Sequence, residues 1–312
     1  MEVLEIRNLT KKFGKKTIID NMSLTVNEGE IYGFLGPNGS GKTTVIKCIM
    51  GLLKMTKGDV FVCGHSVKKN YEKAAELFGG IIENPEMYGA LKGKTNLKVF
   101  STLYPNVTAE RIEEIGKLVG LEGRLNEPIK KYSLGMRQRL GLALSLVHNP
   151  KLLILDEPTN GLDPKGVKEL RDILKKLAKQ GTAIFISSHL LSEMELMCDK
   201  VCIIDKGKII DIKDLTKAGA EGVDAFTGVE VFEYVYETSN DEKTYELAVL
   251  KGINASKGDG QRCIIHTSKE NAAKFTKYLV DQGIHVYLMM IKSKTLEELY
   301  METTESKRGG VK

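Results

Sequence analysis

The sequence lacks several features that mark particular classes of protein. It has five cysteines, an odd number, and none of them stands in a C-x-x-C pair. This pattern suggests neither a disulfide framework nor a zinc site, and it fits a reducing cytoplasm. No apolar run approaches the roughly 18 residues of a membrane span, and the opening "MEVLEIRNLT" has acidic residues where a signal peptide has a basic and then an apolar region. We therefore expect any link to a membrane to come through a partner.

A strong charge of one sign is also missing. The 312 residues include 46 Lys and Arg against 41 Asp and Glu, for a formal net charge of +5. This mild bias is not the basic stripe that nucleic-acid-binding proteins usually show, so we expect no direct contact with nucleic acid. Hydrophobic residues make up 42% of the chain, an ordinary share for a globular core, and the length leaves room for about two domains.

The hydrophobic pattern in the first half of the chain predicts sheet followed by a helical insertion. "MEVLEIRNLT" and "TIIDNMSLTV" alternate like an antiparallel strand pair, and a strand at "EIYGFL" enters a glycine-rich turn. A helix and a short hairpin element at "TKGDVFVCG" come next. Strand signals then stop, and three segments have helical periodicity: "TNLKVFSTLY", "TAERIEEIGKLVG" and "GMRQRLGLALSLV". We expect an inserted helical lobe over about 84–150.

The second half of the chain predicts a parallel sheet and then a separate small domain. Strands return at "KLLIL", "TAIFIS", "KVCIID" and "KIIDI", with helices over 164–179 and 190–197 between the first three. Near-continuous apolar strands that alternate with helices indicate an α/β fold, in which a parallel sheet is covered on both faces. We expect one domain over 1–215 and a small α+β domain over 216–312.

The predicted small domain combines strands with helices. The strands are expected at "VEVFEYVYET", "QRCIIHTS" and "HVYLMMIK", and the helices at "KTYELAVLKG", "KENAAKFTKYLVDQ" and "TLEELYMETT". The last residues, "ESKRGGVK", are expected to form a frayed tail.

The strongest local signal is "GPNGSGKTT", which matches G-x-x-x-x-G-K-[ST] between a predicted strand and a predicted helix. In such a loop, glycines let successive backbone N–H groups turn toward phosphates, Lys42 reaches the β and γ oxygens, and Thr43 ligates magnesium. A glycine-rich turn that only caps a helix is the weaker alternative, because the required context is met. The residues predicted to bind a nucleotide are Gly36, Pro37, Asn38, Gly39, Ser40, Gly41, Lys42, Thr43 and Thr44.

Two further segments place polar side chains at the ends of predicted strands. "LLILDEP" puts Asp156 and Glu157 at the edge where a parallel sheet binds its ligands. Asp156 would hold the magnesium, while Glu157 would orient and deprotonate the water that attacks the γ-phosphate. "ISSHLL" puts His189 near the same edge, where it would contact the γ-phosphate and that water. The alternatives are two solvated acids and a structural histidine.

A Ser-Leu-Gly turn in "KKYSLGMRQRLGLAL" offers a second anion site at the head of a helix. Together with the phosphate loop, "LLILDEP", "NGLDP" and "SSH", it occurs in the order and approximate spacing of the ATP-binding cassette (ABC) ATPases, which the chain resembles over roughly 1–213. More narrowly, "GGIIENPEMYGALKGKTNL" and "YSLGMRQRLGLAL" resemble the bacitracin-resistance and lantibiotic-immunity branch of exporters. The resemblance implies a P-loop NTPase (RecA-like) core with an antiparallel β subdomain and an inserted helical lobe, followed here by the small C-terminal domain.

The resemblance also implies a site shared between two cassettes. In that family two cassettes pair head to tail, so Ser133 and Gly135 would contact the γ-phosphate of an ATP bound to a second copy of the chain. Asp163 would lie at the same interface. Phe13 matches the aromatic position that stacks on adenine, a contact that needs only a π face. The alternative for Phe13 is an ordinary core aromatic.

Two departures from the family pattern stand out. The signature usually reads Leu-Ser-Gly-Gly-Gln, and here Tyr132, Leu134 and Met136 replace three of its residues. Phosphate binding is expected to persist, although the loss of the Gln amide at Met136 would weaken contact with the opposite nucleotide. Glu83 stands where most of the family has a Gln that reaches the magnesium and the transmembrane partner. Its alternative is a solvated acid on a loop.

The function implied by the resemblance is an Mg²⁺-dependent ATPase subunit of an exporter that drives separate permease subunits and lies on the inner face of the cell membrane. A cassette ATPase that acts on nucleic acid or the ribosome is the rival, but such proteins commonly have two cassettes or long coiled-coil insertions, which are missing here. A nonhydrolytic ATP-binding module is disfavoured because Glu157 and His189 are both present. The transported substrate cannot be inferred, because it would contact the partner.

Overall fold

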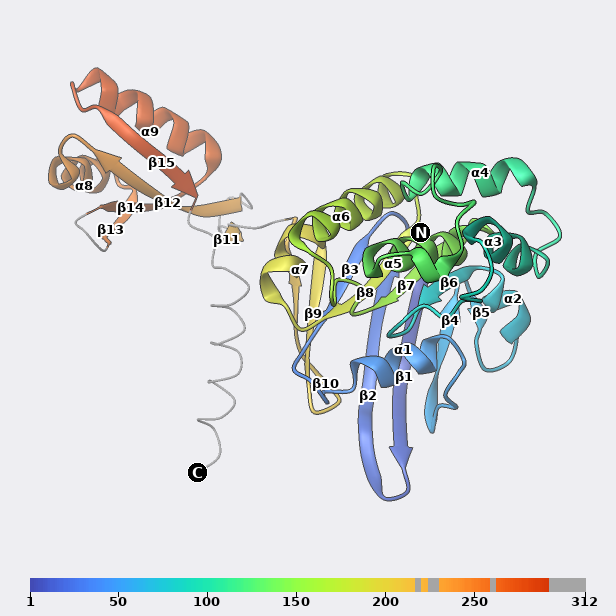
Figure 1. Ribbon diagram of the computed structural model, residues 1–312. Helices are drawn as coiled ribbons and strands as arrows, with labels where there is room; N and C mark the ends of the chain where they lie inside the picture. Colours follow the sequence, from blue (N-terminus) through green and yellow to red (C-terminus); the bar gives the residue numbers. More distant parts are fainter. Residues whose placement is uncertain (217–219, 224–229, 259–261, 292–312) are drawn as a thin grey trace. The chain divides into compact units, whose positions relative to one another are not determined.

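A computed structural model describes residues 1–216, 220–223, 230–258 and 262–291. The chain divides into two compact units, the first made of residues 1–215 and the second beginning at residue 216 (Figure 1). The helix predicted at "TLEELYMETT" and the predicted tail lie outside the described residues.

The N-terminal strands of the first unit form an antiparallel sheet. Its strands are ordered β2 (Lys16–Asn27), β1 (Glu2–Phe13), β4 (Lys57–Val62) and β5 (His65–Ser66). Apolar side chains from one face of this sheet join those of the central sheet and of α1 in one buried core. The predicted strand pair and hairpin are thereby confirmed.

The central sheet has six strands, ordered β10 (Lys208–Asp214), β9 (Lys200–Asp205), β3 (Ile31–Leu35), β8 (Ala183–Ser188), β7 (Leu152–Asp156) and β6 (Phe78–Ile81). The strands from β9 to β6 are parallel, as predicted. Strand β10, which no predicted helix separates from β9, runs antiparallel to it. The reason is a two-residue turn in which Lys206 and Gly207 both have positive φ, the geometry of a tight hairpin.

Helices cover both faces of the central sheet, which explains why β3, β7 and β8 are buried along their whole length. Tyr32 and Phe34 point into the core shared with α1 (Lys42–Ile49). Gly33 points to the opposite face, where an added Cβ would lie 2.8 Å from the Sγ of Cys198, directly after α7 (Leu191–Met197). Helix α6 (Pro164–Lys179) packs on β3 and β8, and the short α2 (Tyr71–Ala75) lies beside β5 and β6.

The predicted helical lobe contains α3 (Gly93–Ser101), α4 (Ala109–Leu118), the 3-10 turn η1 (Ile129–Lys131) and α5 (Leu134–Leu146). Within residues 84–150, all of which are described, no strand forms, and one isolated bridge joins Lys92 to Pro128. Helix α5 sits very close to β6: a Cβ added at Gly79 would lie 1.8 Å from the Ser145 carbonyl oxygen. Glycine is therefore required at this contact between the lobe and the sheet.

The described residues of the second unit form a five-stranded sheet and two helices. The sheet runs β11 (Ala220–Val223), β12 (Glu230–Thr238), β14 (Cys263–Thr267) and β13 (Asn254–Lys257), and β15 (Val286–Ile291) also pairs with β12. Aromatic side chains of β12 pack against α9 (Lys269–Asp281) in a core of its own, and α8 (Asp241–Leu250) contacts β13 and β14. Strands β11 and β13 were not predicted, since each has only four residues.

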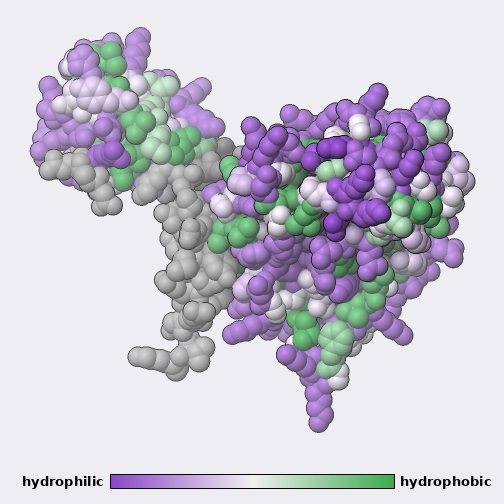
Figure 2. All heavy atoms as spheres, viewed as in Figure 1, coloured by the Kyte–Doolittle hydropathy of each residue, from purple (hydrophilic) through white to green (hydrophobic). Residues whose placement is uncertain are grey.

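Most of the surface in view is hydrophilic, with small apolar patches between charged side chains (Figure 2). None of the helices in the described part of the chain is long and apolar enough to cross a membrane.

Candidate nucleotide-binding site

The glycine-rich turn between β3 and α1 is built to expose its backbone. Gly39 and Gly41 have φ of 80° and 111°, which a side chain would disfavour. The Lys42 ammonium folds back and donates to the carbonyl oxygens of Gly36 at 2.7 Å and Pro37 at 3.4 Å. Lys42 is only 6% exposed, so its charge is held at the mouth of the turn by backbone carbonyls. This is a cationic cradle suited to phosphate oxygens.

Asp156 ends β7 directly behind this turn. Its carboxylate is buried, and both oxygens are hydrogen bonded: Thr43 Oγ1 donates to Oδ2 at 2.8 Å, and Ser187 Oγ donates to Oδ1 at 2.6 Å. A buried carboxylate needs such partners to remain charged. The Thr43 hydroxyl and the Asp156 carboxylate are hard oxygen ligands, so this pair fits a magnesium ion that keeps several of its own waters.

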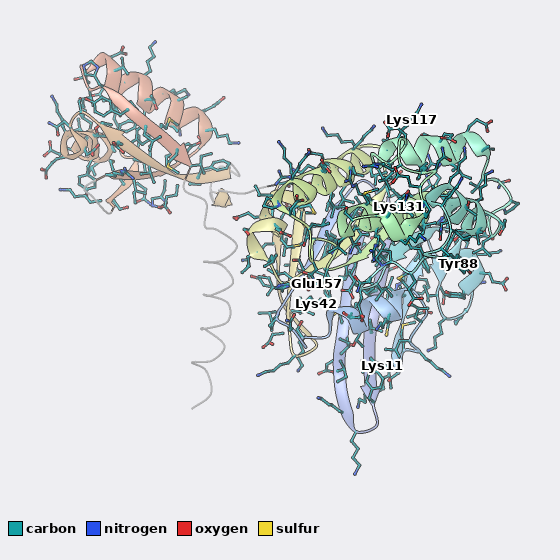
Figure 3. The ribbon with its side chains drawn as sticks, in the orientation of Figure 1. Lys11, Lys42, Tyr88, Lys117, Lys131 and Glu157 are labelled. Carbon is teal, nitrogen blue, oxygen red and sulfur yellow. The ribbon has the colours of Figure 1, made fainter. Side chains whose placement is uncertain are left out.

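Glu157 lies between two other predicted residues. Glu157 and Lys42 lie next to each other (Figure 3), with Glu157 Oε1 3.1 Å from Lys42 Nζ. The other carboxylate oxygen, Oε2, is 2.8 Å from Nδ1 of His189. The Glu157 backbone has a φ of 50°, an uncommon conformation for a residue with a side chain. The structure thus brings together the three residues predicted to act as base, phosphate-contacting lysine and histidine.

These side chains surround a cavity of about 290 Å³. Eight of the predicted residues line it, together with Ile18 and Asn160, which sequence reasoning missed. The predicted lining residues are Asn38, Gly39, Gly41, Lys42, Thr43, Thr44, Glu157 and His189. Three predicted loop residues do not line it: Gly36, Pro37 and Ser40. Ser40 has a buried Oγ with no hydrogen-bond partner among the described residues.

Phe13 lies outside this cavity, at the end of β1, and is 51% exposed. It is therefore not a core aromatic. The ammonium of Lys11 lies 4.6 Å from the centroid of its ring. Strand β2, which pairs with β1, contributes Ile18 to the cavity. The strand pair therefore supplies both an apolar contact at the cavity and an exposed aromatic ring.

The signature turn is separate from the phosphate loop of the same chain. Ser133 caps α5 and accepts a hydrogen bond from the Met136 N–H at 3.2 Å, while Asp163 caps α6 and accepts from Gly166 at 2.8 Å. With Gly135, these two caps line a second cavity of about 380 Å³ that contains none of the phosphate-loop residues. One chain therefore holds the two halves of the predicted site in different places.

Glu83 pairs with a lysine in this structure. Its carboxylate lies 3.3 Å from Lys47 Nζ, and its side chain is 66% exposed. Lys47 belongs to α1, the helix that begins at the phosphate loop, so Glu83 lies beside that helix.

Comparison with known proteins identifies the family. Residues 19–160 match the ABC transporter family model. The uncharacterized ABC transporter ATP-binding protein YhcH of Bacillus subtilis is 47% identical, with 97% of this chain and 96% of that protein covered. The chain belongs to the ATP-binding subunits of ABC transporters. The predicted family is thereby confirmed.

Other relatives of this ABC subunit support the narrower resemblance. The bacitracin transport ATP-binding protein BcrA of Bacillus licheniformis is 43% identical, covering 96% of each chain. The lantibiotic transport ATP-binding protein SrtF of Streptococcus pyogenes is 43% identical over 67% of this chain and 89% of its own. A solved structure of an ATP binding subunit of an ABC transporter, 27% identical, superposes with a TM-score of 0.63 over 68% of this chain and 90% of that one. The predicted P-loop NTPase fold is likewise confirmed.

Proposed function

We propose that this ABC subunit hydrolyses MgATP at sites shared by two copies of the chain and thereby drives separate permease subunits. The observation that carries the proposal is the cavity where Lys42, Thr43, Glu157 and His189 meet, with Asp156 directly behind them. Hydrolysis needs side chains that contact the phosphates, hold the metal and deprotonate the attacking water, and these residues supply a side chain for each task.

In this proposal the residues of the cavity divide the chemistry. Lys42 contacts the terminal phosphate oxygens, and Glu157 accepts the proton of the attacking water. His189, hydrogen bonded to Glu157 through Nδ1, holds that carboxylate in place and presents its other face to the γ-phosphate. Thr43 and Asp156 would hold magnesium, which neutralises charge that develops on the phosphates.

The second copy is proposed because the signature turn needs an ATP that its own chain does not place there. The Ser133 hydroxyl accepts from Met136 N–H and keeps its own proton, which it can donate to a phosphate. The free N–H groups of the first turn of α5 add positive potential. Asp163, which lines the same cavity, would lie at the shared interface. A head-to-tail pair of chains brings this turn to the opposite phosphate loop.

A groove in the first unit suits the permease partner. This groove, of about 330 Å³, lies between the sheet and the helical lobe and is lined by aromatic residues, among them Tyr71, Phe100 and Tyr104. It also includes Asn84 and Pro85, which follow Glu83 directly. A groove that combines aromatic with polar side chains fits a short helical segment of a protein partner. This partner would hold the subunit at the inner face of the membrane.

The relatives suggest what such a transporter moves. BcrA, named for bacitracin transport, aligns with 96% of this chain, a span that includes most of the second unit. We propose efflux of a peptide antibiotic, residues 1–215 as the ATPase domain and residues 216–312 as an accessory domain. A cassette that acts on the ribosome or nucleic acid is the alternative, and recovery of the chain from detergent-solubilised membranes with an integral membrane protein distinguishes the two.

Mixing two inactive variants tests the shared site. Lys42→Ala removes the phosphate contact of one chain, and Ser133→Arg blocks the signature turn of the other. A heterodimer of the two has one intact composite site and one doubly broken site, so the mixture should form ATP-dependent dimers and recover part of the ATPase activity. The control is the chain that carries both substitutions, measured alone, in which neither composite site is intact. Equal dimerisation by each single variant alone would contradict the shared site.

A further inference from the structure

Ser187 is a buried hydroxyl that contacts both acidic residues of the site. It lies in β8, fully buried, in register with Asp156 on the neighbouring strand β7. Its Oγ donates to Asp156 Oδ1 at 2.6 Å and accepts from the Glu157 N–H at 3.0 Å. We propose that Ser187 is a positioning residue that orients Asp156 toward the metal and fixes the backbone of Glu157.

The first link determines which way the Asp156 carboxylate turns. Because Ser187 occupies Oδ1, Oδ2 is left facing the hydroxyl of Thr43 in α1, a second predicted metal ligand. Without the hydroxyl, a buried Oδ1 has lost its partner and the carboxylate gains from rotating toward other donors. Removing the hydrogen-bond partner of a metal-ligating carboxylate usually changes metal affinity by about 10- to 100-fold.

The second link holds Glu157 in its uncommon conformation. The Glu157 N–H lies 3.2 Å from the Ser187 carbonyl oxygen as well as 3.0 Å from its Oγ. With a φ of 50°, this residue needs its backbone fixed by its surroundings. One side chain on β8 therefore sets the position of the metal-holding carboxylate and of the proposed base that follows it.

The adjacent serine provides a matched comparison. Ser188 is equally buried, but its Oγ accepts from the Leu190 N–H at 3.0 Å. It therefore belongs to the turn that precedes α7. Loss of its hydroxyl should affect that turn and leave metal binding unchanged.

The experiment compares Ser187→Thr with Ser187→Val, which have the same shape and differ only in the hydroxyl. Manganese binding in the presence of ATP is followed by electron paramagnetic resonance, with Glu157→Gln in every chain to prevent turnover. We expect Ser187→Val to need at least about tenfold more Mn²⁺ for half-saturation than Ser187→Thr. Ser188→Ala should match the parent chain. ATP binding in EDTA, measured with a fluorescent nucleotide, should be the same in all of them.

Equal Mn²⁺ affinity of the Thr and Val variants would overturn the proposal, and so would a shared fall in unfolding temperature with unchanged metal binding. If neither β-branched variant folds, Ser187→Ala against Ser188→Ala decides by the same measurement. The inference rests on the proposed role of Asp156, so Asp156→Asn is included. Unchanged Mn²⁺ binding in Asp156→Asn would reject the metal site of the proposed function itself, whereas a loss there with no effect of Ser187→Val rejects only the role of Ser187.

Discussion

Replacing Glu157 with Gln tests the proposed chemistry most directly. The side chain keeps its shape, and its amide can still accept from Lys42 through oxygen and donate to His189 through nitrogen, the two groups that lie at 3.1 and 2.8 Å. The fold should therefore be unaffected, while the group that accepts the proton is lost. A general base contributes about 10²- to 10⁴-fold to a rate, or ~2.7–5.5 kcal/mol of activation free energy.

The same substitution should strengthen ATP binding. In the structure described here, Lys42 is paired with Glu157, and this pair has to separate before the ammonium can contact phosphate. Both side chains are largely buried, at 6% and 16% exposure, so breaking the pair costs at least about 1 kcal/mol and its removal should lower the Kd for ATP by about fivefold or more. Glu157→Gln also removes a negative charge beside the γ-phosphate.

Phosphate release under single-turnover conditions measures the first effect, and titration with a fluorescent ATP analogue measures the second. Size-exclusion chromatography with ATP should show an accumulated dimer. Glu157→Asp is the control, since it keeps the charge but shortens the reach of the base. Phosphate release at a near-wild-type rate in Glu157→Gln would refute the assignment of Glu157 as the base.

Three further substitutions test other parts of the structure. Glu83→Gln should weaken the magnesium dependence of ATPase activity and leave metal-free nucleotide binding unchanged or slightly tighter. If wild type and Glu83→Gln give the same magnesium titration of ATPase activity, both with and without the membrane partner, Glu83 is only a solvated loop acid. In a denaturant titration, Gly79→Ala should lower the free energy of unfolding by at least roughly 1–3 kcal/mol, because its Cβ would lie 1.8 Å from the Ser145 carbonyl oxygen. Gly89 has open space around it, so Gly89→Ala should be neutral in the same titration. Burial lowers the pKa of His148, so on acidification the unfolded chain takes up this proton before the folded chain does. The free energy of unfolding should therefore fall as the pH drops from about 6.5 toward the pKa of the folded state. In His148→Gln this part of the pH dependence should vanish, and an unchanged slope of stability against pH would contradict the assignment.

Much of the first unit could be predicted because its signals are local. The phosphate loop needs glycines at fixed offsets, and the buried strands are continuous apolar runs. Strand β6 was missed because "FGGI" has two glycines and little β propensity; it forms because α5 packs directly onto Gly79. The direction of β10 does not follow from its apolar pattern; it follows from the tight turn at Lys206 and Gly207.

Only those site residues that belong to a recognisable sequence motif could be predicted. Lys42, Asp156 and Glu157 come from short motifs whose spacing specifies their place, and the structure brings them together. Ser187 could not be singled out, because a serine inside an apolar strand acquires a partner only when the neighbouring strand is in register. The pairing of Glu83 with Lys47 joins segments 36 residues apart and depends on the packing of the loop against α1.

Helix α5 has residues at both of the surfaces where this subunit is proposed to meet other chains. Its first turn holds Ser133 and Gly135 at the cavity proposed for the opposite ATP, and its later residues Gly141, Leu144 and Ser145 line the aromatic groove proposed for the permease. A helix of 13 residues is about 20 Å long and does not bend easily. Ser145 is packed against Gly79 with no free space, so this end of the helix is held against β6. In the proposed transporter, the stiff helix would carry a displacement at the groove to the signature turn, and so link the membrane partner to the nucleotide without a hinge inside the helix.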